Sequence, residues 1–210
     1  MRVYQILWGL LALVPAGVLA LDAETLQKDW RWIREDAEEW KLSDDGALRI
    51  RTQPGRIWAE REEKAENILV RRAPVADQDS IEIAVKLVDP MIKYEQAGVV
   101  LYVDDDRFVK FVVEYIDGDY FVVMGREFAG EKRLVLAKVK IEGQGSQLRL
   151  EVEGNKVKGS WKSADGNSEG WTPATEASIP AELTRSFAVF TQDGPADEVR
   201  WAEIDLQAKR

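Results

Sequence analysis

The sequence predicts an all-β protein, built as a sandwich of two antiparallel sheets. Short apolar segments recur about every eight to twelve residues with turn residues between them, which is the spacing of a sandwich or a barrel. One predicted strand, residues 107–115, is also apolar on both faces, with Phe108 and Val112 on one side and Phe111 and Val113 on the other. A strand covered on both sides belongs in the middle of a sheet in a layered protein.

The stretch from Tyr94 to Glu127 is predicted as three consecutive strands joined by two turns. Three Asp residues at positions 104–106 form the first turn, and Asp117 with Gly118 forms the second. The Asp-Gly pair favours a hairpin, because both central residues of the preferred tight turn have positive φ. The predicted strands are Gln96–Val103, Arg107–Tyr115 and Tyr120–Arg126.

Elsewhere, strands are predicted where apolar residues alternate with charged ones. Residues 22–46 fit two interpretations, and a strand at Trp30–Arg34 followed by a helical turn at Ala37–Trp40 would satisfy both. A helical turn is also expected within the charged segment 59–66. The remaining predicted strands lie at residues 47–51, 67–71, 81–87, 134–141, 148–153, 156–162, 187–191 and 199–206.

Residues 1–20 are predicted to be a secretory signal peptide. Arg2 provides the positive start, an apolar run follows from Ile6 to Val14, and Ala20 closes a segment suited to cleavage. Pro15 interrupts the run, which is shorter than the ~20 residues that span a bilayer; an uncleaved anchor is the alternative. We therefore expect residues 21–210 to form one sandwich domain, secreted or periplasmic, without membrane contact after cleavage.

The composition narrows the possible chemistry. The 210 residues include no His and no Cys, which rules out His-based acid–base catalysis, thiolate nucleophiles and His- or Cys-ligated metals. The formal net charge of −9 argues against nucleic acid as a partner. Any catalysis would depend on carboxylates, Lys, Tyr, Ser or an oxygen-ligated metal.

Several motifs resemble a known family. They include W-x-W-x-R-E from Trp30, N-I-L-V-R from Asn67, Y-E-Q-A-G-V-x-L-Y from Tyr94 and E-Y-x-D-G from Glu114. In this order they resemble a concanavalin A-like family found as the C-terminal domain of family-43 β-xylosidases and as stand-alone "regulation of enolase"-type proteins. The resemblance implies a jelly-roll sandwich and favours a strand at Trp30–Arg34. It also implies an accessory or sugar-binding unit, and it supplies no catalytic residues.

Two groups of residues are predicted to bind a ligand, which we expect to be a carbohydrate. On the last strand Ala202 and Ile204 are in phase as a buried face, so Trp201 and Glu203 should point the other way. A Trp among acids on a sheet face suits sugar stacking. The second group is expected on one surface of the middle sheet and consists of Lys110, Glu114, Tyr120 and Arg126.

Other chemistries remain as alternatives. Asp104 and Asp106 are candidate Ca²⁺ ligands, although a solvated hairpin turn explains the same residues, and no other cofactor is expected. Glu203 and Asp205 superficially resemble the E-x-D core of sandwich glycosidases, without the further Glu that such enzymes need. The leading interpretation is a non-catalytic carbohydrate-binding or accessory domain. A carboxylate-dependent glycan hydrolase or lyase, and a structural domain that binds other proteins, are the alternatives.

Overall fold

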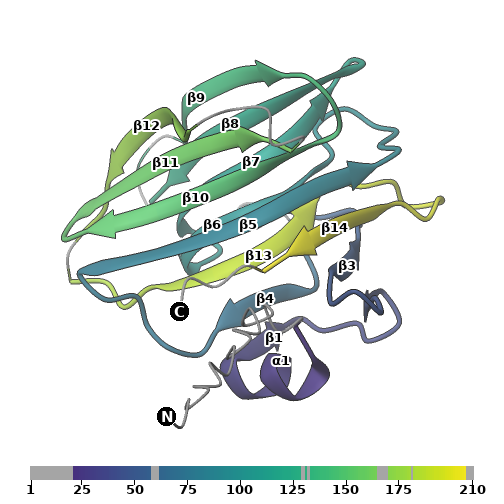
Figure 1. The fold of residues 1–210 in the computed structure, drawn as a ribbon, viewed down its shortest axis with the longest axis horizontal. Helices are drawn as coiled ribbons and strands as arrows, with labels where there is room; N and C mark the ends of the chain where they lie inside the picture. The colour runs from purple at the N-terminus through teal and green to yellow at the C-terminus, as the bar shows by residue number, and fades with distance from the viewer. Residues whose placement is uncertain are drawn as a thin grey trace, which may run out of the picture.

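A computed structural model describes residues 21–57, 62–128, 131, 133–164, 170–180 and 182–206. Two seven-stranded antiparallel sheets pack face to face in it (Figure 1). Sheet A has the strand order β1-β4-β13-β6-β7-β8-β9, and sheet B has the order β12-β11-β10-β5-β14-β3-β2. The predicted all-β sandwich of two antiparallel sheets is therefore confirmed.

The described elements are one short helix and fourteen strands. Their bounds are α1 Ala23–Asp29, β1 Trp30–Ile33, β2 Trp40–Leu42, β3 Leu48–Arg51, β4 Ile68–Arg71, β5 Gln78–Val88, β6 Gln96–Asp104, β7 Arg107–Ile116, β8 Asp119–Glu127, β9 Leu134–Ile141, β10 Gly145–Glu153, β11 Lys156–Ser163, β12 Thr172–Ser178, β13 Ser186–Gln192 and β14 Trp201–Asp205.

The main core lies between the sheets and is built by strict alternation along the strands. Every second residue of β7, including Phe111, faces sheet B, whose inward residues include Leu148 and Ile204. All three are fully buried. Removing this apolar surface from water is the largest favourable contribution to the fold.

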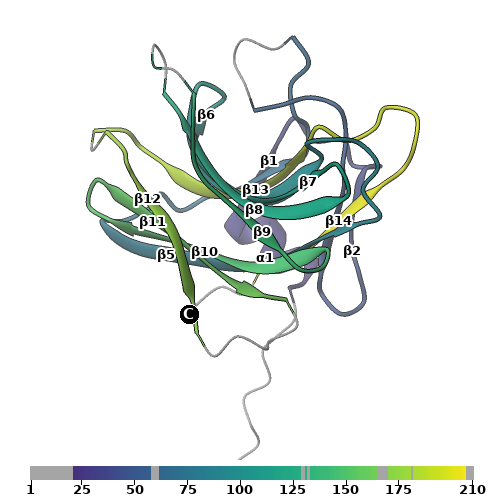
Figure 2. The same cartoon turned by 90° about the horizontal axis from the view of Figure 1, so that it is seen from above.

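A second apolar layer covers the outer face of sheet A. Ile57 and Ala65 lie on it and pack into one cluster with residues of β6, β7 and β13 that include Phe108, Val112 and Phe190. An isolated bridge from Arg56 to Lys64 closes the loop that carries them. This second layer explains why the middle strand is apolar on both faces. Figure 2 shows that sheet A is curved and that its hollow side is turned away from sheet B.

The hairpin predictions agree closely with the structure. The three predicted strands become β6, β7 and β8, and Asp117 and Gly118 both have positive φ, of 51° and 97°. The strand interpretation of Trp30–Arg34 is confirmed, with α1 before it.

One other local prediction is wrong, and a second is not supported in the part of its segment that the structure describes. Residues 37–40 form a turn that enters β2 rather than a helical turn, and the described part of segment 59–66, residues 62–66, contains no helix. Strand β12 was also not predicted. The proposed signal peptide lies outside the described residues, and no helix within them is long and apolar enough to cross a membrane.

Candidate functional site

Three buried polar side chains lie in a row on the outer, hollow face of sheet A. Gln96 of β6 and Lys110 and Glu114 of β7 are only 1%, 3% and 7% exposed. Lys110 Nζ donates to Gln96 Oε1 at 2.5 Å, and Gln96 Nε2 donates to Glu114 Oε1 at 3.0 Å. The amide of Gln96 thus links a cation to an anion. We call these three residues the polar row.

The register of the strands explains why the row faces outward. Gln96 and Glu114 are direct cross-strand partners, and Lys110 lies four residues from Glu114 along β7, on the same face and with Val112 between them. The cross-strand partner of Lys110 on β8 is Gly125. A Cβ atom there would lie 3.6 Å from Lys110 Cε and 3.2 Å from the Leu134 carbonyl oxygen, so the glycine leaves room for the lysine side chain.

Burial shifts both ionisable members of the row toward their neutral forms. Desolvation lowers the pKa of Lys110 to about 8, although the Glu114 carboxylate acts against the shift. Desolvation likewise raises the pKa of Glu114, and Lys110, Arg133 and Lys138 oppose this effect. The ammonium group of Lys110 is therefore held charged at neutral pH by a modest margin. Shifted pKa values of this kind are frequent at functional sites.

An exposed aromatic residue is fixed at one end of the row. Tyr94 is 43% exposed and has φ 76°, a backbone conformation that is costly for a bulky residue. Its N–H donates to the Tyr115 carbonyl at 2.8 Å, and its own carbonyl accepts from Gln96 Nε2 at 2.9 Å. The polar row therefore helps to hold Tyr94 in this strained conformation.

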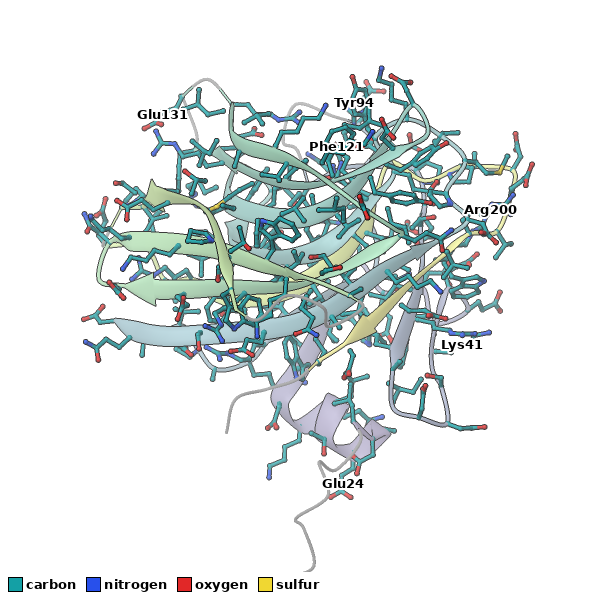
Figure 3. All side chains as sticks on the ribbon, turned by 45° about the horizontal axis from the view of Figure 1, so that its top comes forward. Glu24, Lys41, Tyr94, Phe121, Glu131 and Arg200 are labelled. Atoms are coloured by element: carbon teal, nitrogen blue, oxygen red, sulfur yellow. The ribbon has the colours of Figure 1, made fainter. Side chains whose placement is uncertain are left out.

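A second aromatic side chain lies next to Glu114. Phe121 of β8 is the cross-strand partner of Glu114 and is half-buried. The Lys138 ammonium lies 4.3 Å from the centre of its ring. Figure 3 places Tyr94 and Phe121 at the same end of the molecule, with Glu131 at the other side. Neither residue was predicted to bind a ligand; their one signal in the sequence is their position beside Gln96 and Glu114 in the predicted hairpin.

A pocket opens at the other end of the row. Its polar lining consists of three cations, one carboxylate and one amide, and its apolar lining of two side chains from the second core. The lining residues are Arg56, Lys110, Arg133, Glu127, Gln192, Ile57 and Phe108.

The structure does not bring all of the predicted ligand residues together. Lys110 and Glu114 share the outer face of sheet A, as predicted. Tyr120 and Arg126 lie on the opposite face of the same sheet, since their cross-strand partners are Tyr115 and Val109. Arg126 Nη1 donates to the Ser178 carbonyl of β12, in the other sheet, at 3.1 Å. The expectation that they lie beside Lys110 is therefore wrong, because they are one residue out of phase with it.

Trp201 and Glu203 occupy the outer face of sheet B. They point away from the buried Ala202 and Ile204, as predicted. Glu203 forms an ion pair with Arg49, and the Lys41 ammonium lies 4.8 Å from the Trp201 ring centre. These residues thus form a separate surface from the polar row.

The Asp-rich turn is held by cations of the protein itself. Asp104 forms an ion pair with Arg107 and accepts from the Asp106 N–H at 3.0 Å, while Asp105 takes two hydrogen bonds from Arg34. No group of three potential metal ligands is found in the part of the chain that the structure describes. A turn stabilised by Arg accounts for this geometry better than a Ca²⁺ site.

Two buried carboxylates of the outer face of sheet A, Glu114 and Glu127, lie too far apart to form the acid pair of a glycosidase. Such enzymes hold two carboxyl groups within about 10 Å of each other. Glu127 is the other buried carboxylate on this face, and it lies opposite Phe108, six residues along the strand from Glu114. At ~3.3 Å per residue the two positions are ~20 Å apart. The row can bind and orient polar groups, but these two acids cannot act on one bond.

Comparison with solved structures shows the same fold in glycoside hydrolase chains. The GH43 protein BlXynB from Bacillus licheniformis matches with a TM-score of 0.70 and 19% identity, over 84% of this chain and 35% of that one. The Bacteroides ovatus protein described as Xyloglucan PUL GH43B matches with a TM-score of 0.68 and 18% identity, over 89% and 38%. This chain therefore spans just over a third of the length of these proteins.

A shorter protein also has this fold. A functionally unknown protein from Saccharomyces cerevisiae matches with a TM-score of 0.64 and 15% identity, over 85% of this chain and 94% of that one. No curated protein matches the sequence. The family model described as the "Beta xylosidase C-terminal Concanavalin A-like domain" matches residues 21–191. The chain belongs to that family, the concanavalin A-like C-terminal domains of β-xylosidases.

Proposed function

We propose that this chain is an exported, non-catalytic β-sandwich that binds carbohydrate on the hollow face of sheet A. The observation that carries the proposal is the polar row of Gln96, Lys110 and Glu114, bordered by the aromatic rings of Tyr94 and Phe121. Sugars have apolar C–H faces that stack on aromatic rings and hydroxyl groups that need hydrogen-bond partners.

The energetics of the row support a binding role. Burying a lysine and a glutamate costs free energy that a purely apolar face would avoid. Within the described residues, Glu114 Oε2 accepts no hydrogen bond, whereas Oε1 takes one from Gln96. That oxygen suits a ligand hydroxyl. The strained backbone of Tyr94 at the edge of the row is a further feature typical of ligand-binding sites.

The family supports an accessory role. The chain belongs to a family of β-xylosidase C-terminal domains, and its structural relatives include GH43 proteins that are more than twice as long. In this proposal the domain contributes binding rather than bond cleavage. The predicted signal peptide supports export, and N-terminal sequencing of the protein recovered from outside the cytoplasm would test it.

Affinity electrophoresis of the purified protein through gels that contain xylan, xyloglucan or pectin tests carbohydrate binding. We expect retardation by at least one polysaccharide. Phe121→Ala and Tyr94→Ala should each weaken it about tenfold, because each loses a stacking surface worth about 1.4 kcal/mol.

Trp201→Ala is the matched control, since it removes an aromatic side chain from the other sheet. We expect its retardation to equal that of the wild type. Retardation that depends on Trp201 and not on Phe121 or Tyr94 would place the site on sheet B. An absence of retardation in all of the gels would count against the proposal.

A further inference from the structure

The pocket at the far end of the polar row differs in charge from the rest of the molecule. Three of its lining residues are cations, Arg56, Lys110 and Arg133, and Glu127 is the one carboxylate among the described lining residues. The whole chain carries a formal charge of −9. A local excess of positive charge in an acidic protein attracts an anion, and concave sites with low-dielectric walls strengthen that attraction.

Lys110 has donor capacity left for such an anion. Its ammonium group has three N–H bonds, and its one hydrogen-bond partner in the described residues is Gln96 Oε1. The Lys110 side chain is only 3% exposed, and it lines the pocket. A buried ammonium with unused donors is costly unless something accepts from it.

The carboxylates that act on Lys110 and Arg56 in the structure lie outside the lining of the pocket. Glu114 acts on Lys110 through Gln96, on the side of the row away from the pocket. Arg56 forms an ion pair with Asp193, which is not part of the pocket lining. Phe108 and Ile57 provide an apolar floor. A planar carboxylate on a ring with apolar C–H groups matches this combination of walls.

We propose that the pocket binds the carboxylate of an acidic sugar residue, so that the carbohydrate recognised by this face is a uronic acid-containing polysaccharide. Lys110 donates to the carboxylate, Arg133 faces it, and the rest of the sugar extends along the polar row toward Phe121 and Tyr94. This inference rests on the proposed carbohydrate-binding function and specifies the class of its ligand.

The test compares polygalacturonate with its fully methyl-esterified form in affinity gels. Esterification removes the charge and leaves the sugar ring in place. We expect the acidic form to bind at least about tenfold more tightly, since a charge-assisted hydrogen bond is lost on esterification. Equal retardation by both forms would overturn the pocket assignment and leave carbohydrate binding intact. No retardation by either form, or by the neutral polysaccharides, would overturn both.

Two substitutions in the pocket and one control substitution test which residues cause the preference for the acidic form. Lys110→Met should abolish the preference for the acidic form, and Arg133→Gln, which changes a more exposed position, should reduce it. Lys158→Met removes an exposed lysine from the outer face of sheet B and should preserve it. A preference that survives both Lys110→Met and Arg133→Gln in folded protein would overturn the assignment.

A second readout follows Lys110 itself. Addition of D-galacturonate should shift the ¹³C resonance of Lys110 Cε and raise the apparent pKa of its amine above its unliganded value of about 8, because a nearby anion favours the charged form. The groups that already act on this amine are Glu114, Asp193, Arg56 and Arg133. D-galactose should leave the pKa unchanged. If acetate produces the same shift as galacturonate at equal concentration, the pocket recognises free carboxylates and the sugar assignment is wrong.

Discussion

Sheets A and B each have seven strands and one face that is turned away from the main core, and the two outer faces differ in how deeply their charged side chains are buried. On sheet B, charged side chains form exposed cross-strand ion pairs, such as Lys156 with Glu176, whose side chains are about half exposed. On sheet A, Lys110 and Glu114 are buried and connected through Gln96. An exposed ion pair contributes little and tolerates change, whereas a buried charge constrains its surroundings.

The difference arises from the segment that covers sheet A. Ile57 and Ala65 complete a second apolar layer on that face, so the polar row lies at the border of a hydrophobic cluster rather than in open water. Nothing comparable is found over sheet B among the described residues. The outer face of sheet A therefore carries buried ionisable side chains, whereas the ion pairs on the outer face of sheet B range from half-exposed, as in Lys156 with Glu176, to partly buried, as in Arg149 with Glu82.

The largest expected effect comes from displacing the covering segment. A Cβ atom on Gly194 would lie 2.1 Å from the Thr52 carbonyl oxygen, at the start of that segment. Gly194→Val should lower the free energy of unfolding by about 3 kcal/mol or more, since the backbone must shift. Urea unfolding monitored by Trp fluorescence measures this. Gly170→Ala, where the new Cβ meets nothing within 4 Å, is the control and should change stability by less than about 0.5 kcal/mol. If both variants had similar free energies of unfolding, the segment that carries Ile57 and Ala65 would not be rigidly held.

The next effect is the loss of a member of the polar row. Lys110→Met leaves Gln96 Oε1 without its donor, so we expect the free energy of unfolding to fall by about 2 kcal/mol. In a double-mutant cycle with Glu114→Leu, the coupling energy should exceed about 1 kcal/mol, because the two residues share one network. Additive effects of the two substitutions would show that Gln96 does not couple them.

The pH dependence of stability should reveal the buried lysine. Lys110 has a pKa of about 8 in the folded protein, whereas an unfolded lysine titrates near a pKa of ~10.4. Between these values the unfolded chain binds more protons, so the stability of the wild type relative to Lys110→Met should rise as pH increases from about 8 to 10, by at most about 3 kcal/mol. Urea unfolding of both proteins at several pH values gives the difference. A constant difference would indicate that the Lys110 pKa is not shifted.

The smallest effect is expected for the exposed pair on sheet B. Lys156→Met and Glu176→Gln should show a coupling energy below about 0.5 kcal/mol, because solvent screens the interaction between half-exposed side chains. The same cycle repeated at high salt should show no coupling at all. Coupling as large as that between Lys110 and Glu114 would remove the contrast between the two faces.

Most of the fold could be predicted because it depends on local patterns. The Asp117–Gly118 turn and the alternation in β6, β7 and β8 are visible in the sequence. Strand β12 escaped prediction because it contains Pro173 and has one buried apolar residue, Ala177, which gives little alternation to detect. It is an edge strand of sheet B, where proline is tolerated.

The candidate site was only partly predictable. Lys110 and Glu114 share a face through simple alternation, so the sequence identified both. Gln96 is distant from them in sequence and joins the polar row through the register of β6 with β7. Phe121 lies beside Glu114 through the register of β7 with β8. Tyr120 and Arg126 were placed on the wrong face, because alternation along one strand does not state which residue of the next strand is its partner.

The sequence alone determined the all-β class, the hairpins and the outward direction of Trp201, since each follows from the alternation of side chains or from the φ angles that a turn requires. Only the tertiary structure decided which outward face carries buried charge. That depends on which strands pair and on where a distant loop packs, and both are set by contacts between residues far apart in the chain. The sequence places Lys110 on an outward face, but its burial and its hydrogen bond to Gln96 follow only from the tertiary structure.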